Sequence, residues 1–317
     1  MVAEREPPVR VPVLAHLAGF GELMIPGLST AVPQAEFFEI TSGAPPPVPS
    51  EILVTLLSDH PTLAPALAGV RWIHVLGAGV DGFPLDLVGD RTLTCSRGAS
   101  APAIAEYVLA TMLAFEKHLP DTWISAPPQR WNTATLGGLR GRTAGLIGLG
   151  AIGTEVAKRA LAFDMEVVAA RRDPDKPAAA DVRIAPLHEV LARADHLVVS
   201  AASTEATRHL VGVEALQKVK PGVHLVNVAR GALVDQKALL EALEDGRVAM
   251  ASLDVVEPEP LPEGDPLYSH PRVRLTPHVS WSSPDTGTRT LAMFADNFNR
   301  WRSGDPLLGV VDPSRGY

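Results

Sequence analysis

The stretch GLIGLGAIG at residues 145–153 predicts more about the fold of this 317-residue chain than any other segment. An apolar run, TAGLI, leads into its glycines, and a segment with helical spacing, AIGTEVAKRALAF, follows them. Gly148 suits the tight turn, Gly150 suits close approach by a pyrophosphate, and Gly153 suits close packing of the helix on the strand. The stretch therefore predicts a strand–turn–helix unit that binds a dinucleotide.

The expected cofactor contacts extend from this turn to the end of the next strand. The phosphates would lie on the backbone amides of Ala151 and Ile152, at the start of the helix. The next apolar run, MEVVAA, ends at Arg171 and Arg172, where an NAD-binding domain normally has an acidic residue for the ribose 2′-hydroxyl. A guanidinium there can pair with a 2′-phosphate, which predicts a preference for NADP(H). In the alternative, both arginines are solvated and Asp173 binds the ribose of NAD.

Composition excludes several classes of function. The formal charge of −8 and the lack of a Lys/Arg run argue against nucleic acid as a partner, and no apolar run is long enough to span a bilayer. No secretory apolar run follows the first ten residues. The single cysteine, Cys95, excludes an intramolecular disulfide and fits a reducing, cytoplasmic location. Cys95 ends the run TLTC, where we expect a small buried side chain, and we expect no metal site.

Short apolar runs alternate with helical patterns, which is typical of a mostly parallel sheet covered by helices, and so of an α/β fold. Since the glycine motif begins near residue 148, the upstream region must belong to another domain or to part of one, and the length fits about two domains. We expect a helix over 101–119 and strands within VPVLAHL (11–17), EILVTLL (51–57), VRWIHVL (70–76), RTLTC (91–95), TAGLIGL, MEVVAA, HLVVSA, GVHLVNVA, RVAMASLDVV and VRLTPHV.

Three polar residues follow apolar runs in the second half of the chain: Arg230 in NVARG, Glu259 in EPEPLP and His278 in TPH. Open α/β sheets bind ligands at the carboxyl ends of their strands, where all three are expected. Reduction of a 2-keto acid needs a hydride from nicotinamide, a proton and a cation. His278 can supply the proton, Glu259 can favour the protonated ring and fix its tautomer, and Arg230 can polarise the carbonyl and orient the carboxylate.

Longer signatures surround these residues, among them LGAGVDGF (76–83), RGASAPAIAEYVLA (97–110) and KVKPGVHLVNVARGALVDQKALLEALEDGRVAMASLDVVEPEPLP. Through them the chain resembles the D-isomer-specific 2-hydroxyacid dehydrogenase family, and in particular its glyoxylate/hydroxypyruvate reductases. The resemblance implies an NAD(P)-dependent oxidoreductase that acts on a small 2-keto or D-2-hydroxy acid. With the arginines after MEVVAA, it implies a reductase that prefers NADPH.

The resemblance also implies an architecture. Two Rossmann-like domains with parallel sheets are expected, the cofactor domain being inserted into a flavodoxin-like substrate domain. Residues 1–98 and 283–317 would form the substrate-binding domain, and residues 99–282 the dinucleotide-binding domain. Dimerisation through the segment 101–140 is implied as well, giving a homodimer.

The same resemblance implies the remaining site residues. Arg230, Glu259 and His278 keep the roles given above, with Arg230 also binding substrate. The loop GAGVD would offer the amides of Ala78 and Gly79 to the substrate carboxylate. Further cofactor contacts are expected at Asp254, for the nicotinamide carboxamide, and at Thr207. The family has a proline after the strand HLVVSA where this chain has Ala202, so the shape of that loop stays open.

Other interpretations stay open. Each catalytic candidate has a structural alternative, and Glu257 competes with Glu259 as partner of the histidine, although the family pattern favours Glu259. His74 and His270 match no motif, and we expect structural roles for both. A second class of function is a dinucleotide-sensing, corepressor-like interaction protein, which can retain the same residues. A phosphite dehydrogenase is a minor alternative, because GAGVD lacks the lysine expected in that branch.

Overall fold

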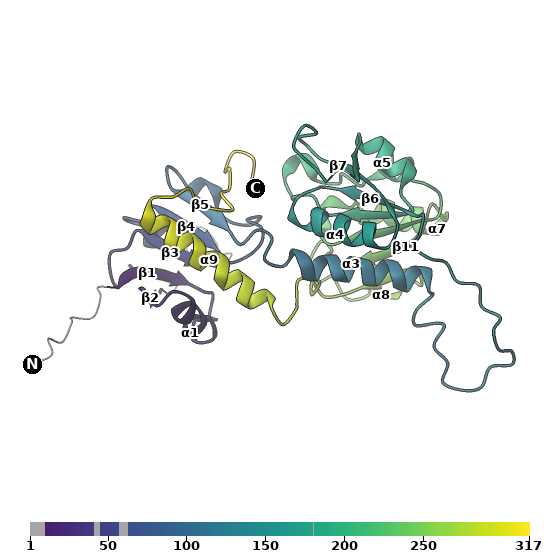
Figure 1. Ribbon diagram of the computed structural model, residues 1–317, viewed down its shortest axis with the longest axis horizontal. Coiled ribbons are helices and arrows are strands. Elements are labelled where there is room, and N and C mark those ends of the chain that lie inside the picture. The colour runs from purple at the N-terminus through teal and green to yellow at the C-terminus, as the bar shows by residue number, and fades with distance from the viewer. Residues whose placement is uncertain (1–9, 41–44, 57–62, 180) are drawn as a thin grey trace, which may run out of the picture. The chain divides into compact units, whose positions relative to one another are not determined.

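The computed structural model describes residues 10–40, 45–56, 63–179 and 181–317 (Figure 1). Residues 1–9, for which the sequence predicts no secretory signal, and the end of the run 51–57 lie outside the described residues. The chain forms two compact units, Met1–Ser100 with Ser283–Tyr317, and Ala101–Ser282. The second unit is therefore inserted between two segments of the first.

The first unit is built on a parallel sheet with the order β2-β1-β3-β4-β5 in the part of the chain that the structure describes. This is the strand order of flavodoxin-like folds. Its elements are β1 (Val11–His16), α1 (Gly21–Ala31), β2 (Ala35–Glu39), β3 (Ile52–Thr55), the 3₁₀ helix Ala64–Leu67, β4 (Trp72–Val75), the 3₁₀ helix Leu85–Leu87, β5 (Thr92–Cys95) and α9 (Thr286–Ser303).

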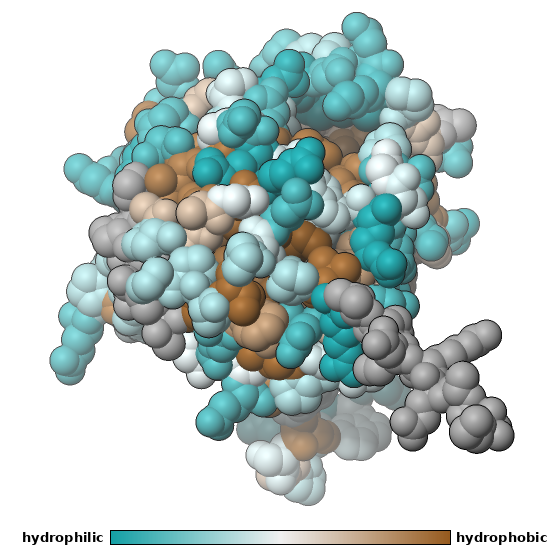
Figure 2. Space-filling view, turned by 90° about the vertical axis from the view of Figure 1, so that its left-hand side faces the viewer, coloured by the Kyte–Doolittle hydropathy of each residue, from teal (hydrophilic) through white to brown (hydrophobic). Residues whose placement is uncertain are grey.

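Helices α1 and α9 cover one face of this sheet (Figure 1). Phe294 and Phe298 of α9 are fully buried there, and the ring of Phe294 stacks on Trp72 of β4 with 5.6 Å between centroids. Large aromatic side chains gain much from such burial, so the C-terminal helix is fixed to strands from the start of the chain. Figure 2 shows one face of the molecule, where apolar and polar residues alternate over short distances, as is usual for protein surfaces.

The second unit contains a longer parallel sheet, with the order β12-β11-β10-β9-β6-β7-β8 among the described residues. Its elements are α3 (Ala101–Glu116), β6 (Thr143–Ile147), α4 (Ala151–Ala162), β7 (Glu166–Ala170), β8 (Val182–Ile184), α5 (Leu187–Arg193), β9 (His196–Val199), the 3₁₀ helix Glu205–Thr207, α6 (Val213–Leu216), β10 (Val223–Asn227), the 3₁₀ helix Gly231–Leu233, α7 (Gln236–Glu244), β11 (Val248–Leu253), α8 (Pro266–Ser269) and β12 (Val273–Leu275).

Helices cover both faces of this second sheet. Helices α3 and α4 pack on one face, through residues such as Val108 and Val156, and α5 and α7 pack on the other, through Leu191 and Leu239. The strand order reverses between β6 and β9, the place where doubly wound sheets bind dinucleotides. The predicted α/β class, with parallel sheets in two Rossmann-like units, is confirmed.

The register of the second sheet decides where its loops begin. Asn227 of β10 pairs with Leu253 of β11, and Leu253 pairs with Leu275 of β12. Because the three strands are parallel neighbours, the loops that follow them leave the sheet at the same edge. These loops carry Arg230, Glu259 and His278.

The sequence-based expectation differs from the structure at a few elements. Each predicted strand is present, but α1 and the edge strands β2 and β8 were not predicted, and the helix expected over 101–119 ends at Glu116. Strand β8 is only three residues long, too short for the alternation of apolar residues to be visible. Within the described ranges, no helix combines the length and the apolar character needed to cross a membrane.

Candidate active site

The glycine-rich turn joins β6 to α4. Gly148 has φ of 102°, and a Cβ there would lie 2.7 Å from the backbone nitrogen of Ala201, so the position accepts no larger residue. Gly150, the N-cap of α4, has open space where a Cβ would be and gives the helix no side-chain cap. Open space beside uncapped helix amides suits an anionic group such as a pyrophosphate, so this turn fits the dinucleotide predicted from the sequence.

Arg171 follows β7 directly beside this turn, since the Gly148 amide donates to the carbonyl of Ala170 (2.8 Å). The guanidinium of Arg171 donates to the carbonyls of Pro174 and Pro177 (3.2 and 3.3 Å), which orders the loop after the strand. Arg172 is exposed at the next position. Asp173, the alternative ribose ligand, lies 4.0 Å from the ammonium of Lys176.

The segment after β9 flanks the other side of the turn. The Ser200 hydroxyl donates to the carbonyl of Gly148 (3.0 Å). Thr207 closes the short turn that follows, because its Oγ1 donates to the carbonyl of Ala202 (2.8 Å) and accepts from the amide of Thr204 (2.8 Å). The chain thus builds an ordered loop at Ala202, and the side chain of Thr207 helps to fold that loop.

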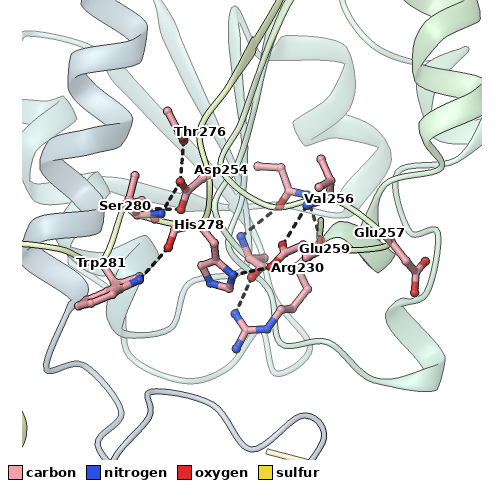
Figure 3. Close-up of polar contacts among 12 residues, drawn as sticks. Arg230, Asp254, Val256, Glu257, Glu259, Thr276, His278, Ser280 and Trp281 are labelled. Carbon is pink, nitrogen blue, oxygen red and sulfur yellow. Dashed lines mark hydrogen bonds and ion pairs between the residues drawn. The ribbon is translucent and has the colours of Figure 1, made fainter. Parts of the chain in front are cut away.

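His278 and Glu259 form the central polar contact of the second unit (Figure 3). His278 Nδ1 lies 2.8 Å from Glu259 Oε2, and the two side chains are 38% and 37% exposed. A carboxylate only accepts, so Nδ1 carries the hydrogen and Nε2 is left as the nitrogen that exchanges a proton with a ligand. Glu259 Oε1 accepts a hydrogen bond from the Val256 amide (3.1 Å), which fixes the carboxylate itself.

Asp254 holds the backbone that carries His278. The carboxylate is buried and accepts hydrogen bonds from the Thr276 hydroxyl (2.6 Å), the Val279 amide (2.8 Å) and the Ser280 amide (2.9 Å). His278 has φ of 54°, a conformation that is uncommon for residues other than glycine, and its own amide donates to the Asp254 carbonyl (2.9 Å). Asp254 therefore maintains a strained turn that presents the imidazole.

Two further residues complete this network. Tyr107 of α3 places its hydroxyl 2.7 Å from Thr276 Oγ1, and Trp281 donates from Nε1 to the carbonyl of His278 (2.8 Å). Burial raises the pKa of the Tyr107 phenol, so the hydroxyl stays protonated. The role of Tyr107 could not be read from spacing, because Tyr107 lies far from His278 in the chain and meets Thr276 only through the packing of α3.

The turn after β10 orients Arg230. The buried side chain of Asn227 accepts from the Ala229 amide (3.1 Å) and donates to the Arg230 carbonyl (3.0 Å), which closes the turn in NVARG. Arg230 donates from Nη1 to the carbonyl of Ala229 (2.7 Å). The structure thus brings Arg230, Glu259 and His278 to the loops of three adjacent strands, and it adds Asn227 as the residue that shapes the first of these loops.

The other candidate substrate contacts lie in the first unit. Ala78 and Gly79 belong to the loop after β4, where Ala78 is exposed. Cys95 of β5 is buried beneath this loop, with Sγ 3.6 Å from the carbonyl of Ala78. The expected small, buried side chain is confirmed, and burial raises the pKa of the Cys95 thiol.

The competing residues have structural partners. His74 is buried between Thr94 and Ser96, and burial lowers its pKa to about 3. His270 contacts Glu244. Glu257 points away from His278 (Figure 3). Within the described segments, no group of His, Cys, Asp and Glu side chains is arranged to hold a metal ion.

Comparison with known proteins agrees with this geometry. The model of the family "D-isomer specific 2-hydroxyacid dehydrogenase, NAD binding domain" matches residues 109–280. The chain is 38% identical over 221 residues to the hydroxypyruvate reductase of Thermotoga maritima, covering 67% of this chain and 71% of that protein. It is 36% identical over 254 residues to the D-3-phosphoglycerate dehydrogenase of Bacillus subtilis, covering 78% of this chain. It spans about half the length of that relative, 48%.

A solved structure extends the similarity to the whole chain. The NADPH-dependent glyoxylate/hydroxypyruvate reductase of Sinorhizobium meliloti, in complex with NADP and sulfate, superposes with a TM-score of 0.83 at 25% identity. The match covers 97% of this chain and all of that one. Family model, relatives and fold agree, and the chain belongs to the D-isomer specific 2-hydroxyacid dehydrogenase family.

Proposed function

We propose that this protein is an NADPH-dependent reductase of a small 2-keto acid of the glyoxylate or hydroxypyruvate type. The observation that carries the proposal is the hydrogen bond between His278 and Glu259, on loops that neighbour the Arg230 loop at the carboxyl edge of the sheet. Together these residues provide a proton, a carboxylate partner and a cation, the set that reduction of a charged carbonyl compound requires.

The chemistry assigns one task to each residue. The nicotinamide, when bound, supplies the hydride for the carbonyl carbon. His278 gives its Nε2 proton to the carbonyl oxygen, and in the opposite direction it takes that proton back. Glu259 holds the ring through Nδ1 and balances the charge of the imidazolium. Arg230 binds the substrate carboxylate and polarises the carbonyl.

Three residue groups are proposed for the cofactor. Gly148, Gly150 and Gly153, with the amides of Ala151 and Ile152, would hold the pyrophosphate. Thr207 and Asp254 would line the remainder of the site, the Asp254 carboxylate accepting from the carboxamide. Arg171 and Arg172 would bind the 2′-phosphate, which is why we propose NADPH over NADH; the NADP bound to the related reductase supports this choice.

The substrate proposal rests on the small residues of GAGVD and on the relatives. Ala78 and Gly79 would bind the substrate carboxylate through their amides, with residues 1–98 and 283–317 as the substrate domain and 99–282 as the cofactor domain. The hydroxypyruvate and glyoxylate/hydroxypyruvate reductases among the similar proteins support a two- or three-carbon keto acid. The phosphoglycerate dehydrogenase makes 3-phosphohydroxypyruvate a compound to include in the test.

We propose a cytoplasmic homodimer that forms through the segment 101–140. After α3 this segment leaves the second unit as a long loop (Figure 1), on which Trp123 and Trp131 are 72% and 69% exposed. Exposed tryptophans of this kind are typical of interface residues. Sedimentation of the protein and of a Trp123→Ser/Trp131→Ser variant tests the dimer, which the double substitution would weaken.

The activity is tested by following the oxidation of NADPH and of NADH by the purified protein with glyoxylate, hydroxypyruvate, 3-phosphohydroxypyruvate and phenylpyruvate. The proposal predicts turnover with NADPH and one of the first two compounds. Tight dinucleotide binding without turnover of any keto acid would favour the sensing, corepressor-like alternative. NAD reduction by phosphite would favour the phosphite dehydrogenase alternative.

A further inference from the structure

Glu257 lies in the same loop as Glu259 but has a different partner. Arg208 donates from Nη1 to Glu257 Oε1 (3.0 Å) and from Nη2 to Oε2 (2.9 Å), a bidentate pair. This hydrogen-bonded pairing lowers the pKa of the Glu257 carboxyl and raises the pKa of Arg208. Both groups are therefore charged at neutral pH, and the carboxylate is turned away from His278 (Figure 3).

The main chain of Glu257 is held as well. Gln236, the first residue of α7, accepts from the Glu257 amide through Oε1 (2.8 Å) and donates from Nε2 to the Glu257 carbonyl (2.8 Å). A side-chain amide that makes both hydrogen bonds to one residue fixes the position and the orientation of its backbone. Glu257 is thus held by Arg208 on its side chain and by Gln236 on its backbone.

The fixed backbone bears directly on Glu259. Val256 donates its amide to Glu259 Oε1, and the peptide between Val256 and Glu257 packs on Gly231, where a Cβ would lie 2.0 Å from the Val256 carbonyl carbon. The peptide that precedes Glu257 is therefore in contact with the turn that carries Arg230. A displacement of Glu257 would therefore also move Val256, whose amide holds the Glu259 carboxylate in place beside His278.

Arg208 connects this loop to the cofactor side of the unit. It follows the turn closed by Thr207, in the segment 200–208 that begins beside Gly148. The segment 200–208 follows β9, whereas the loop that carries Glu257 and Glu259 follows β11. The pair of Arg208 and Glu257 joins them.

We propose that Arg208, Gln236 and Glu257, which we name the acid-loop clamp, are positioning residues for the reaction. The clamp keeps Glu259 Oε2 on His278 Nδ1 and ties that contact to the segment that flanks the dinucleotide turn. This inference rests on the proposed roles of His278 and Glu259. When the clamp is broken, Glu259 leaves the imidazole for part of the time, so less of the histidine is protonated at a given pH.

Other charged or titratable groups lie near the acid-loop clamp. Glu205 faces Arg208, and His209 faces Glu257 and lies 4.0 Å from Asp235. Arg230 follows β10, the strand next to β11, after which the loop of Glu257 begins. Exposed ion pairs contribute little to folding, and Arg208 and Glu257 are about half exposed. We therefore expect the clamp to act on the reaction more than on the stability of the fold.

The test compares Arg208→Met, Glu257→Gln, the double variant and the charge swap Arg208→Glu/Glu257→Arg. Two quantities are measured: kcat against pH with saturating NADPH, and the titration midpoint of the His278 imidazole by NMR in the full chain with NADP. Each single variant should lower kcat roughly 3- to 10-fold and move the midpoint to lower pH by about half a unit. The double variant should be no worse than the singles, and the swap should regain at least half of the loss.

Arg193→Met is the matched control, because Arg193 forms a comparable exposed pair with Glu166 elsewhere in the same unit. It should leave both quantities unchanged. If Arg208→Met does not fold, Arg208→Lys replaces it, because lysine keeps the charge but cannot make the two parallel hydrogen bonds of the guanidinium. The His278 midpoint should then move in the same direction by a smaller amount.

Three results would overturn the inference: an unchanged His278 midpoint in the clamp variants, losses in the double variant equal to the product of the single losses, or an unchanged kcat at saturating NADPH. The NMR measurement needs no turnover. Wild-type protein without activity on any keto acid would reject the proposed function, while the His278 midpoints of the variants would still decide on the clamp.

Discussion

His278 Nδ1 and Glu259 Oε2 lie 2.8 Å apart, although the two residues come from loops after different strands. The Val256 amide holds the second oxygen of the same carboxylate, and Asp254 holds the turn of the histidine. The pair is thus fixed from both sides by buried or backbone groups. This arrangement predicts which substitutions will affect the proton transfer and which will not.

Glu259→Gln should lower kcat for keto-acid reduction roughly 100-fold, because the imidazolium loses the carboxylate that balances its charge. The alkaline limb of the kcat profile should move to lower pH, since the ring then holds its proton less well. The Kd for NADPH, measured by fluorescence, should stay within about threefold. A variant with unaltered kcat would show that Glu259 has no part in the reaction.

Asp254→Asn should weaken both the fold and the activity. The amide nitrogen would face the N–H of Val279 or Ser280, and a buried donor without an acceptor costs about 1–3 kcal/mol. We expect the free energy of unfolding to fall by that amount and kcat to fall at least 10-fold, measured by urea denaturation and steady-state kinetics. Asp265→Asn, which keeps an equally good N-cap on α8, is the control and should change neither.

Arg171→Ala should reduce kcat/KM for NADPH by roughly 10- to 100-fold, the loss expected for a charged hydrogen bond to a phosphate. Activity with NADH, which has no 2′-phosphate, should stay within about threefold. Arg183→Ala, which removes an arginine of β8 that pairs with Glu189, is the control. Equal losses with both cofactors, or a wild-type preference for NADH, would contradict the phosphate-binding role.

His74 should make the stability of the first unit depend on pH. Burial lowers its pKa to about 3, so it is neutral in the folded protein and charged in the unfolded chain below pH 6.5. Its contribution is therefore complete above pH 6.5 and decreases as the pH falls towards 3, by about 3 kcal/mol at pH 4.5. Between pH 7.5 and pH 5.0, the free energy of unfolding measured with urea should fall by about 2 kcal/mol less in His74→Gln than in the wild type. Equal sensitivity would refute this assignment.

The parts of the site that depend on residues close together in the chain could be predicted from the sequence. The turn at Gly148, the strands, and the places of Arg230, Glu259 and His278 after strands follow from apolar periodicity and residue type. The contacts of Tyr107 with Thr276, and of Arg208 with Glu257, could not be predicted, because they depend on how α3 and the loops pack. Glu257 and Glu259 are both followed by proline in the same loop, so their local sequence does not separate them; the family resemblance favours Glu259, and the structure shows that Glu259 is the one that meets the histidine.

The most direct test of the account is the reduction of hydroxypyruvate by NADPH with wild-type protein and with His278→Gln, with the product resolved by chiral chromatography. The account predicts one D-glycerate for each NADPH oxidised by the wild type. For His278→Gln it predicts a rate at least about 100-fold lower, with NADPH still bound. Comparable rates for both proteins would contradict the role given to His278, and an L-glycerate product would contradict the assigned reaction.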